Sequence, residues 1–320
     1  MPVIVVPDDE PPVLTGTELE ERLRSIGELR IFGSRALSDE KLSMRIADAD
    51  VVVNIRSTSR FTRSVLRACR KLRIISIYGV GSDNVDLEAA GELGITVTNT
   101  PGYSAAAVAE MALTLMLAVA RRVVWNDRSV RQGGWAREYG MQLHGKVLGV
   151  VGTGSIGRRV IEVGKALGMW VVAWTFHPLP QRAVELGIEF VALDELLRQS
   201  DVVSVHVLGS AEAEGLIGER QLALMKPTGI LVNTARGSIV DEGALVEALR
   251  QGALAGAGLD VYKSEPLPVG HPFRSMDNVV LSPHVAAMTP ETTLCGLAMA
   301  VDNVVSFLEG RPMNVVTSGQ

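Results

Sequence analysis

A glycine-rich turn lies in the middle of this chain of 320 residues, between an apolar run and a helical pattern. The run Val147–Val151 is typical of a buried strand, and three glycines follow it in the spacing Gly-x-Gly-x-x-Gly. The first glycine permits a tight bend, the second lets backbone approach a pyrophosphate, and the third lets the helix pack closely on the strand. Free amides at the helix start also favour bound phosphate. The residues predicted to bind a dinucleotide here are Gly152, Gly154, Ser155, Ile156 and Gly157.

The chain on either side of this turn alternates between short apolar runs and helical patterns. Such alternation predicts parallel sheets that are covered by helices on both faces. The strands predicted before the turn are Val3–Val6, Leu29–Phe32, Val51–Asn54, Ile74–Ile77 and Ile95–Thr98. The six predicted from the turn onward are Val147–Val151, Trp170–Trp174, Val202–His206, Gly229–Asn233, Gly256–Asp260 and Val279–Leu281.

Two breaks in the alternation divide the chain into domains. A Thr-Pro-Gly sequence at 100–102 ends the first set of strands, and the last helical pattern, about Pro290–Leu308, is too short to fold alone. We therefore predict an α/β protein of two doubly wound parallel-sheet domains. A Rossmann nucleotide domain, residues 101–289, is inserted into a flavodoxin-like substrate domain, residues 1–100 with 290–320. A ligand cleft is expected between them, at the carboxyl ends of the strands.

Composition argues against several classes of protein. The net charge is −5 and no basic block is present, which argues against a nucleic-acid partner. Cys69 and Cys295 are far apart in the sequence, so they predict neither a metal site nor a disulfide framework, and a reducing cytoplasm is the expected location. The apolar stretch Ala105–Ala120 carries Glu110 and is short for a bilayer, so we expect a buried helix and no membrane partner.

Three strand ends after the glycine turn carry one cation, one carboxylate and one imidazole, namely Arg236, Glu265 and His284. Taken alone, such an arginine is usually a surface or cap residue, a Glu-Pro is often a turn, and a Pro-His is often a loop histidine. Together, at one edge of a sheet, they suit hydride transfer to a 2-oxo acid. Arginine can hold the substrate carboxylate in its planar fork, and histidine can donate a proton to the carbonyl oxygen. A carboxylate beside the histidine favours its protonated form.

Short motifs run along the chain in a fixed order: Gly79–Asp86, Asn99–Gly102, Val108–Glu110, the glycine turn, Asp201–His206, Met225–Pro227, Asn233–Gly237, Gly258–Val261 and Ser282–His284. In this order they resemble the motifs of the D-isomer-specific 2-hydroxyacid dehydrogenase family, over nearly the whole chain. The resemblance implies an NAD(P)-dependent oxidoreductase that interconverts a small 2-oxo acid and a D-2-hydroxy acid. It also implies a split substrate domain, a nucleotide domain and a homodimer.

The resemblance implies roles for individual residues. Arg236 would bind substrate, His284 would be the acid/base, and Glu265 would support it. Asp260 would meet the nicotinamide carboxamide. Substrate contacts would also come from Arg56 and from the backbone amides of Val80 and Gly81. Further cofactor contacts are expected at Thr175, His206, Thr234 and Ala235, with His206 structural or cofactor-lining and not a second acid.

The chain departs from the family pattern near the cofactor. Family members that use NAD usually have an acid at the end of the second nucleotide-domain strand, where this chain has Thr175. An acid there would hydrogen-bond the adenosine ribose and repel the 2′-phosphate of NADP. Leu208-Gly209-Ser210 also replaces the frequent Pro-Leu-Thr. We therefore expect NAD or NADP as cofactor, with weak discrimination between them.

Two expectations concern assembly and rival functions. The helical segment from about Ala105 to Val124 is apolar around most of its circumference, so a homodimer through residues 105–140 is predicted. One rival function is a non-catalytic dinucleotide-sensing scaffold or corepressor on the same fold. Another is an enzyme with a different hydride donor, such as formate or phosphite. Turnover of a 2-oxo acid with NADH or NADPH discriminates between these possibilities.

Overall fold

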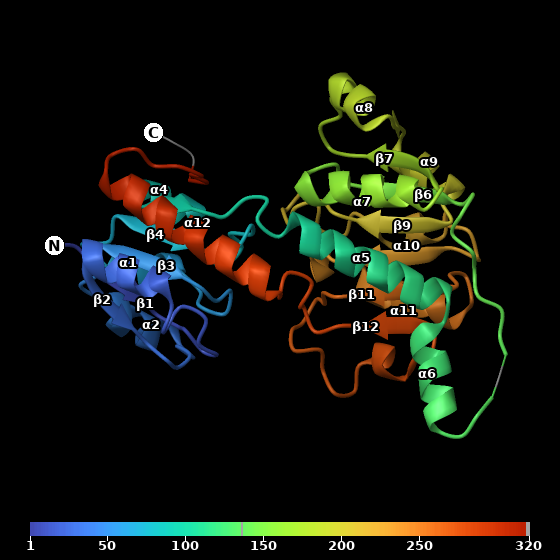
Figure 1. Ribbon diagram of the computed structural model, residues 1–320, viewed down its shortest axis with the longest axis horizontal. Coiled ribbons are helices and arrows are strands. Elements are labelled where there is room, and N and C mark those ends of the chain that lie inside the picture. Colours follow the sequence, from blue (N-terminus) through green and yellow to red (C-terminus); the bar gives the residue numbers. More distant parts are fainter. Residues whose placement is uncertain (136, 318–320) are drawn as a thin grey trace. The chain divides into compact units, whose positions relative to one another are not determined.

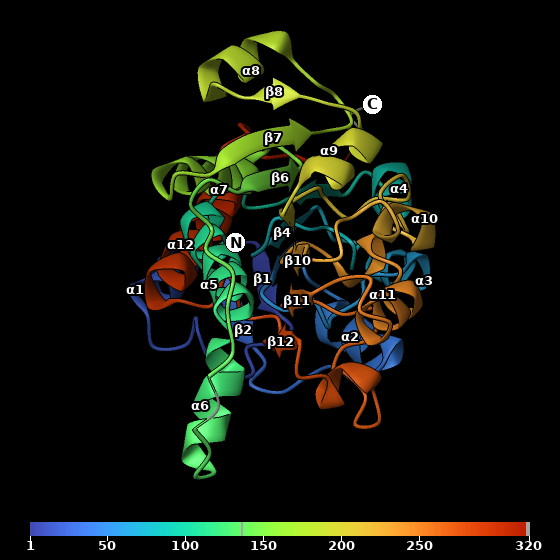
Figure 2. The same ribbon diagram turned by 90° about the vertical axis from the view of Figure 1, so that its right-hand side faces the viewer.

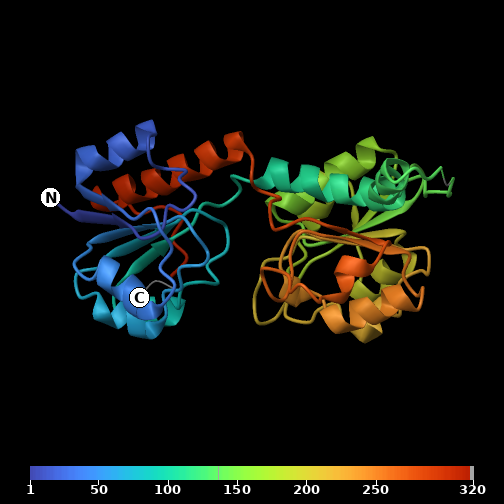
Figure 3. The ribbon, with the colours of Figure 1, turned by 90° about the horizontal axis from the view of Figure 1, so that it is seen from below.

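The computed structural model describes residues 1–135 and 137–317, and it divides into two compact units. Unit 1 is Met1–Ser104 with Thr289–Gln320, and unit 2 is Ala105–Met288. Each unit is a parallel sheet with helices on both faces (Figure 3). The predicted class, α/β with two doubly wound parallel sheets, is confirmed.

Unit 1 contains a five-stranded sheet in the order β2-β1-β3-β4-β5, which is the flavodoxin-like order. Its strands are rich in valine and isoleucine, and helices bury both faces of the sheet, as is typical of parallel sheets. The strands are β1 Val3–Val6, β2 Glu28–Ile31, β3 Val51–Asn54, β4 Ile74–Ile77 and β5 Thr96–Thr98. The helices are α1 Glu18–Ile26, α2 Asp39–Ile46, α3 Arg63–Ala68, α4 Leu87–Glu92 and α12 Pro290–Leu308.

The last helix of the chain, α12, belongs to unit 1 and packs with α1 on β3 and β4 (Figure 3). Thr289 begins it, because its side chain accepts a hydrogen bond from the Thr292 amide and proline follows in the first turn. Among the described residues, α12 is the one helix with the length and hydropathy of a membrane span. Leu297, Val301 and Val304 are instead fully buried in the core of unit 1.

Unit 2 contains a seven-stranded sheet in the order β12-β11-β10-β9-β6-β7-β8 (Figure 2). This is the Rossmann order with one added strand. Strands β6 to β8 follow one another towards one edge of the sheet and β9 to β12 towards the other, so the strand order reverses between β6 and β9. The strands are β6 Val147–Val151, β7 Trp170–Trp174, β8 Glu189–Phe190, β9 Val202–Val205, β10 Ile230–Asn233, β11 Gly256–Leu259 and β12 Val279–Leu281. The predicted number of six was wrong, because β8 is a two-residue edge strand and is too short to show an apolar period.

Helices cover both faces of the unit 2 sheet, with α5 and α7 on one face and α9, α10 and α11 on the other. They are α5 Ala105–Ala120, α6 Val123–Arg131, α7 Ser155–Ala166, α8 Pro180–Leu186, α9 Leu193–Gln199, α10 Glu219–Leu222 and α11 Glu242–Arg250, with 3₁₀ turns at Gly237–Ile239 and Pro272–Ser275. The single helix predicted over 105–124 is two helices. Arg122 adopts a left-handed conformation, φ 53°, which ends one helix, and α6 then runs away from the sheet (Figure 1).

Candidate active site

The glycine turn has the close packing that the sequence predicts for it. Gly152 has a φ of 102°, and an added Cβ there would lie 2.6 Å from the His206 carbonyl carbon. An added Cβ at Gly157 would lie 2.0 Å from the Gly152 oxygen, so neither position admits a side chain. At Gly154 an added Cβ would meet nothing within 4 Å. Backbone at Gly154 is therefore open to a ligand, directly before the first residue of α7.

The start of α7 offers amides to an anion. Gly154 is its N-cap, and among the described residues no side chain caps this end of the helix. Free N–H groups and the positive end of the helix dipole favour phosphate at such a position. The turn from Gly152 to Gly157 therefore fits the pyrophosphate of a dinucleotide, with Ser155 and Ile156 in the first turn.

Three buried polar atoms at neighbouring strand ends have no hydrogen-bond partner among the described residues. They are Thr153 Oγ1 after β6, His206 Nδ1 after β9 and Thr234 Oγ1 after β10. These strands are adjacent and flank the point where the strand order reverses. A buried polar atom without a partner is costly, and functional sites are a common reason for one. The cluster therefore fits polar groups of a dinucleotide bound at this edge.

His206 is neutral in this environment. Its Nε2 lies 2.7 Å from Ser204 Oγ, and its side chain is buried. Burial lowers the pKa of His206 to about 3, because the charged form loses its water. A neutral imidazole suits a cofactor-lining residue and does not suit a proton donor at pH 7.

The end of β7 carries a hydroxyl group where an acid would favour NAD. Thr175 follows the last residue of β7 and is partly exposed. The rings of Trp174 and Phe176 pack edge to face beside it, 4.8 Å apart. Further along, in α8, Arg182 has a buried Nε without a partner among the described residues. This region therefore has a hydrogen-bonding group and a cation but no carboxylate directly after the strand.

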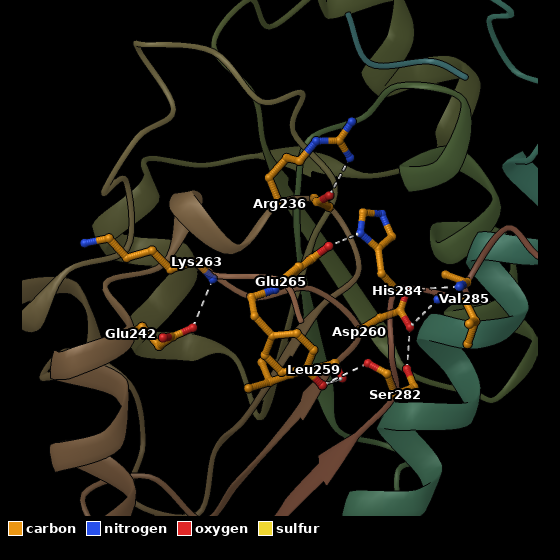
Figure 4. Close-up of polar contacts among 12 residues, drawn as sticks. Arg236, Glu242, Leu259, Asp260, Lys263, Glu265, Ser282, His284 and Val285 are labelled. Carbon is orange, nitrogen blue, oxygen red and sulfur yellow. Dashed lines mark hydrogen bonds and ion pairs between the residues drawn. The ribbon is translucent and has the colours of Figure 1, made fainter. Parts of the chain in front are cut away.

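Arg236, Glu265 and His284 follow β10, β11 and β12, which are neighbours in the sheet. His284 Nδ1 lies 2.7 Å from Glu265 Oε2, and Arg236 reaches over the same edge (Figure 4). A carboxylate can only accept a hydrogen bond, so Nδ1 carries the proton in this pair and Nε2 is available to a substrate. The imidazole and carboxylate side chains are 45% and 36% exposed, which leaves the pair accessible.

The Glu265 carboxylate is ionised at neutral pH. Burial alone would raise its pKa, but hydrogen bonds from His284 and from the Tyr262 amide, and the charge of Arg236, hold the pKa below its ordinary value. The Tyr262 amide is 3.0 Å from Glu265 Oε1 and fixes the carboxylate in place. The charge of Glu265 therefore faces His284 throughout the neutral range.

The loop that carries His284 is organised around the side chain of Asp260, which is completely buried. Its carboxylate accepts hydrogen bonds from the Val285 amide at 3.0 Å, the Ala286 amide at 2.9 Å and the Ser282 hydroxyl. The Asp260 carbonyl also accepts from the His284 amide (Figure 4). These bonds hold His284 in a left-handed conformation, φ 54°, which is uncommon for a residue with a Cβ. The expected contact of Asp260 with a nicotinamide carboxamide stays a prediction.

A second side chain shapes the turn before Arg236. Asn233 Oδ1 accepts from the Ala235 amide at 3.0 Å, and Asn233 Nδ2 donates to the Arg236 carbonyl at 2.9 Å. Arg236 itself donates from Nη1 to the Ala235 carbonyl at 2.8 Å. Thr234 and Ala235 are thereby fixed at the carboxyl end of β10.

The structure brings Arg236, Glu265 and His284 together in unit 2, whereas Arg56, Val80 and Gly81 belong to unit 1. Arg56 Nη2 donates to the Pro11 carbonyl. Val80 and Gly81 are partly exposed, and within residues 1–135 and 137–317 their amides donate to no acceptor. Sequence reasoning missed Thr153, although it lies two residues after the end of the buried strand β6, and a position just past a strand end is the signal that identifies Arg236.

Comparison with known proteins identifies relatives along the whole chain. Residues 113–286 match the family model described as D-isomer specific 2-hydroxyacid dehydrogenase, NAD binding domain. A glyoxylate reductase of Aeropyrum pernix is 46% identical over 287 residues, which cover 87% of this chain and 85% of that protein.

Solved structures agree over nearly the full length. A D-lactate dehydrogenase from Aquifex aeolicus, complexed with NAD and lactic acid, has a TM-score of 0.88 at 28% identity and covers 99% of this chain and 100% of that one. An acyclic imino acid reductase in complex with NADPH and D-Arg has a TM-score of 0.89 at 28% identity, with coverage of 98% and 99%.

Proposed function

The chain belongs to the D-isomer specific 2-hydroxyacid dehydrogenase family, and from this premise we propose the roles of its active-site residues. It is an NAD(P)-dependent 2-oxoacid reductase. We assign proton transfer to His284, support of that residue to Glu265, and substrate binding to Arg236. The observation that carries the assignment is the 2.7 Å hydrogen bond between His284 and Glu265, at strand ends beside that of Arg236.

A nicotinamide dinucleotide, when bound, supplies the hydride to the carbonyl carbon in reduction and accepts it in oxidation. The Arg236 guanidinium binds the substrate carboxylate through parallel N–H donors and so orients the 2-oxo group. His284 Nε2 gives its proton to the carbonyl oxygen, and it takes a proton from the hydroxyl group in the reverse direction. The Glu265 carboxylate accepts the hydrogen bond from Nδ1 and fixes the ring. One proton taken up from the solvent then returns to Nε2, so each reduction consumes one hydride and one proton.

For unit 1, we propose that the amides of Val80 and Gly81 and the guanidinium of Arg56 bind the substrate carboxylate. Support comes from the two residues, which are partly exposed and whose amides have no acceptor within the described residues. Arg56 also has a buried Nε without a partner among those residues. Cations and paired amides are the usual donors to a carboxylate.

The substrate class follows from the relatives, and we propose small 2-oxo acids of the glyoxylate kind. The test is steady-state turnover of glyoxylate, hydroxypyruvate, pyruvate and bulkier 2-oxo acids, each with NADH and NADPH, and of phosphoglycerate, formate and phosphite, each with NAD and NADP. Oxidation of the cofactor with at least one small 2-oxo acid is the expected result. No turnover with any of them would favour a dinucleotide-sensing scaffold, and turnover of formate or phosphite alone would favour a different hydride donor.

Cofactor preference is expected to be weak. Thr175 can hydrogen-bond a ribose hydroxyl group but repels no phosphate, so kcat/KM for NAD and NADP should lie within about 100-fold of each other. The change Thr175→Asp should shift the ratio towards NAD by about tenfold or more, through repulsion of the 2′-phosphate.

The matched control is Thr175→Asn, which has nearly the same shape as aspartate and no charge. It should leave the ratio close to that of the wild type. A wild-type preference for either cofactor beyond about a thousandfold would show that another residue determines cofactor choice.

We also propose a homodimer through residues 105–140. The segment α6 has no buried residue, and it presents Val123, Val124 and Val130 to solvent, with Trp135 and Tyr139 exposed beyond it. An exposed apolar surface of this kind is typical of a subunit interface. Sedimentation of the wild type should therefore give a dimer of the 34.2 kDa chain.

A charge within this surface should weaken the dimer. Val130 is 53% exposed on α6, so Val130→Glu is expected to favour the monomer in sedimentation at micromolar concentration. The control is Val184→Glu on α8 of the same unit, where the valine is 82% exposed and outside the proposed interface. A monomeric wild type, or an equal effect of both changes, would contradict the proposal.

A further inference from the structure

The loop Gly79–Gly81 follows β4 in unit 1 and is held on one side by residues 99 and 100. Gly79 donates its amide to Thr100 Oγ1 at 2.9 Å, and its carbonyl accepts from the Thr100 amide at 3.0 Å. The carbonyl of Val80 accepts from Asn99 Nδ2 at 2.7 Å. Two consecutive carbonyls of this loop are therefore bound from the side of β5.

The orientation of these carbonyls determines where the next amides point. A trans peptide is planar, and its N–H points opposite to its C=O. The Val80 amide shares a peptide with the Gly79 carbonyl, and the Gly81 amide shares one with the Val80 carbonyl. Both N–H groups must therefore face away from Asn99 and Thr100. Gly79 permits this arrangement with a φ of 151°, which residues with a Cβ rarely adopt.

Asn99 is itself held by hydrogen bonds with residues of α12 and of the C-terminal segment. Its carbonyl accepts from Asn303 Nδ2 at 2.8 Å, and its amide donates to the Asn314 carbonyl at 3.1 Å. Asn303 is completely buried, and its Oδ1 accepts from Asn314 Nδ2 at 2.8 Å. The side chain of Asn303 thus has a partner at both ends, so it fixes Asn99 in one position.

We propose that Asn99 and Asn303 are positioning residues that aim the Val80 and Gly81 amides at the substrate carboxylate. Asn99 orients the loop directly, and Asn303 acts through Asn99. The inference rests on the proposed function, in which these amides bind that carboxylate. Two aligned N–H donors contribute to anion binding only while they point at the same place.

The test uses Asn99→Ala as the main variant and Asn303→Leu as the second, because the side chains contribute to the loop from different elements. Binding is measured with oxamate, a 2-oxo acid analogue that is not reduced, by quenching of NADH fluorescence in the enzyme–NADH complex. For Asn99→Ala, we expect the Kd of oxamate and the KM of the 2-oxo acid to rise by about tenfold. For Asn303→Leu, we expect rises of about threefold or more.

The matched control is Ser76→Ala. Ser76 lies in β4, just before the loop, and its buried hydroxyl group donates to the Ala300 carbonyl of α12 at 2.8 Å. This change removes a side-chain hydrogen bond between the same sheet and the same helix but none to the loop. It should leave the Kd of oxamate within about twofold of the wild type. The Kd of NADH, measured without oxamate, should stay within about twofold in all three variants.

Three results would overturn the inference. One is an unchanged oxamate Kd in Asn99→Ala with normal NADH binding, and another is an equal rise in Ser76→Ala. The third is a fall of kcat alone, with KM and oxamate binding unaffected. If Asn99→Ala loses NADH binding through misfolding, the comparison of Asn303→Leu with Ser76→Ala decides. Failure of the proposed function is distinct, because the wild type would then reduce no 2-oxo acid.

Discussion

Replacing His284 by asparagine should lower kcat for 2-oxo acid reduction by about 10²–10⁴-fold, the usual share of general acid catalysis. Asparagine cannot be protonated at neutral pH, so the carbonyl oxygen would lose its proton donor. Asparagine also tolerates the left-handed backbone of residue 284, φ 54°, whereas most residues lose about 1–2 kcal/mol there. The change therefore removes the proton donor and leaves the loop geometry in place.

The control for this prediction is His271→Asn. His271 Nε2 lies 3.0 Å from Glu242 Oε1, so unit 2 contains a second histidine–glutamate pair, whose residues are distinct from Arg236, Glu265 and His284. His271 also caps a 3₁₀ turn, a position that asparagine occupies well. Its replacement should change kcat by less than about twofold. Turnover of His284→Asn close to the wild type, with NADH binding unchanged, would refute the role of His284.

Replacing Arg236 by lysine should lower kcat/KM by at least about tenfold, or about 1.4 kcal/mol. Lysine keeps the charge but is a point donor, and it cannot bind a carboxylate through two parallel N–H groups. The loss should therefore appear mainly in the interaction with the substrate carboxylate. Cofactor affinity, measured by NADH fluorescence, should remain unchanged.

The control is a surface arginine that also binds a carboxylate through two N–H groups. Its replacement by lysine tests whether losing such a pair anywhere in the protein lowers kcat/KM. Arg220 binds both oxygens of Asp194, at 2.7 and 3.0 Å, on the exterior of unit 2. Surface ion pairs contribute little, so Arg220→Lys should leave kcat/KM within about twofold. Equal turnover of a 2-oxo acid and its uncharged amide analogue by the wild type would contradict the role of Arg236.

The parts of the fold and site that the sequence predicts are those that depend on buried strands. Runs such as Val51–Asn54 and Val147–Val151 are buried on both faces, so composition alone marks them and their ends. Parallel strands place their carboxyl ends at one edge of the sheet. Polar residues after adjacent strands therefore meet, and Glu265 and His284 are within hydrogen-bond distance as a result.

The remaining features depend on local geometry that has no sequence period. The two-residue strand β8 is too short to show one. The break at Arg122 has neither proline nor glycine to mark it, because a non-glycine residue takes the left-handed conformation. The role of Asp260 in the His284 loop depends on backbone amides that come near it only when the loop has formed. The hydroxyl of Thr153 has no hydrogen-bond partner in the part of the chain that the structure describes, and this is apparent only once its burial is known.

The central claim is that the His284–Glu265 pair holds the proton that moves in the reaction, and the pH dependence of kcat/KM tests it most directly. Both directions are measured between about pH 5 and 9, for the wild type, His284→Asn and Glu265→Gln. For the wild type, reduction should fall as pH rises, because a neutral imidazole has no proton to give, and oxidation should rise. Glu265→Gln should lower kcat in both directions, since a neutral amide fixes the imidazole ring less firmly than a carboxylate does. His284→Asn should abolish the pH dependence in both directions. The same pH dependence in His284→Asn as in the wild type would contradict the claim.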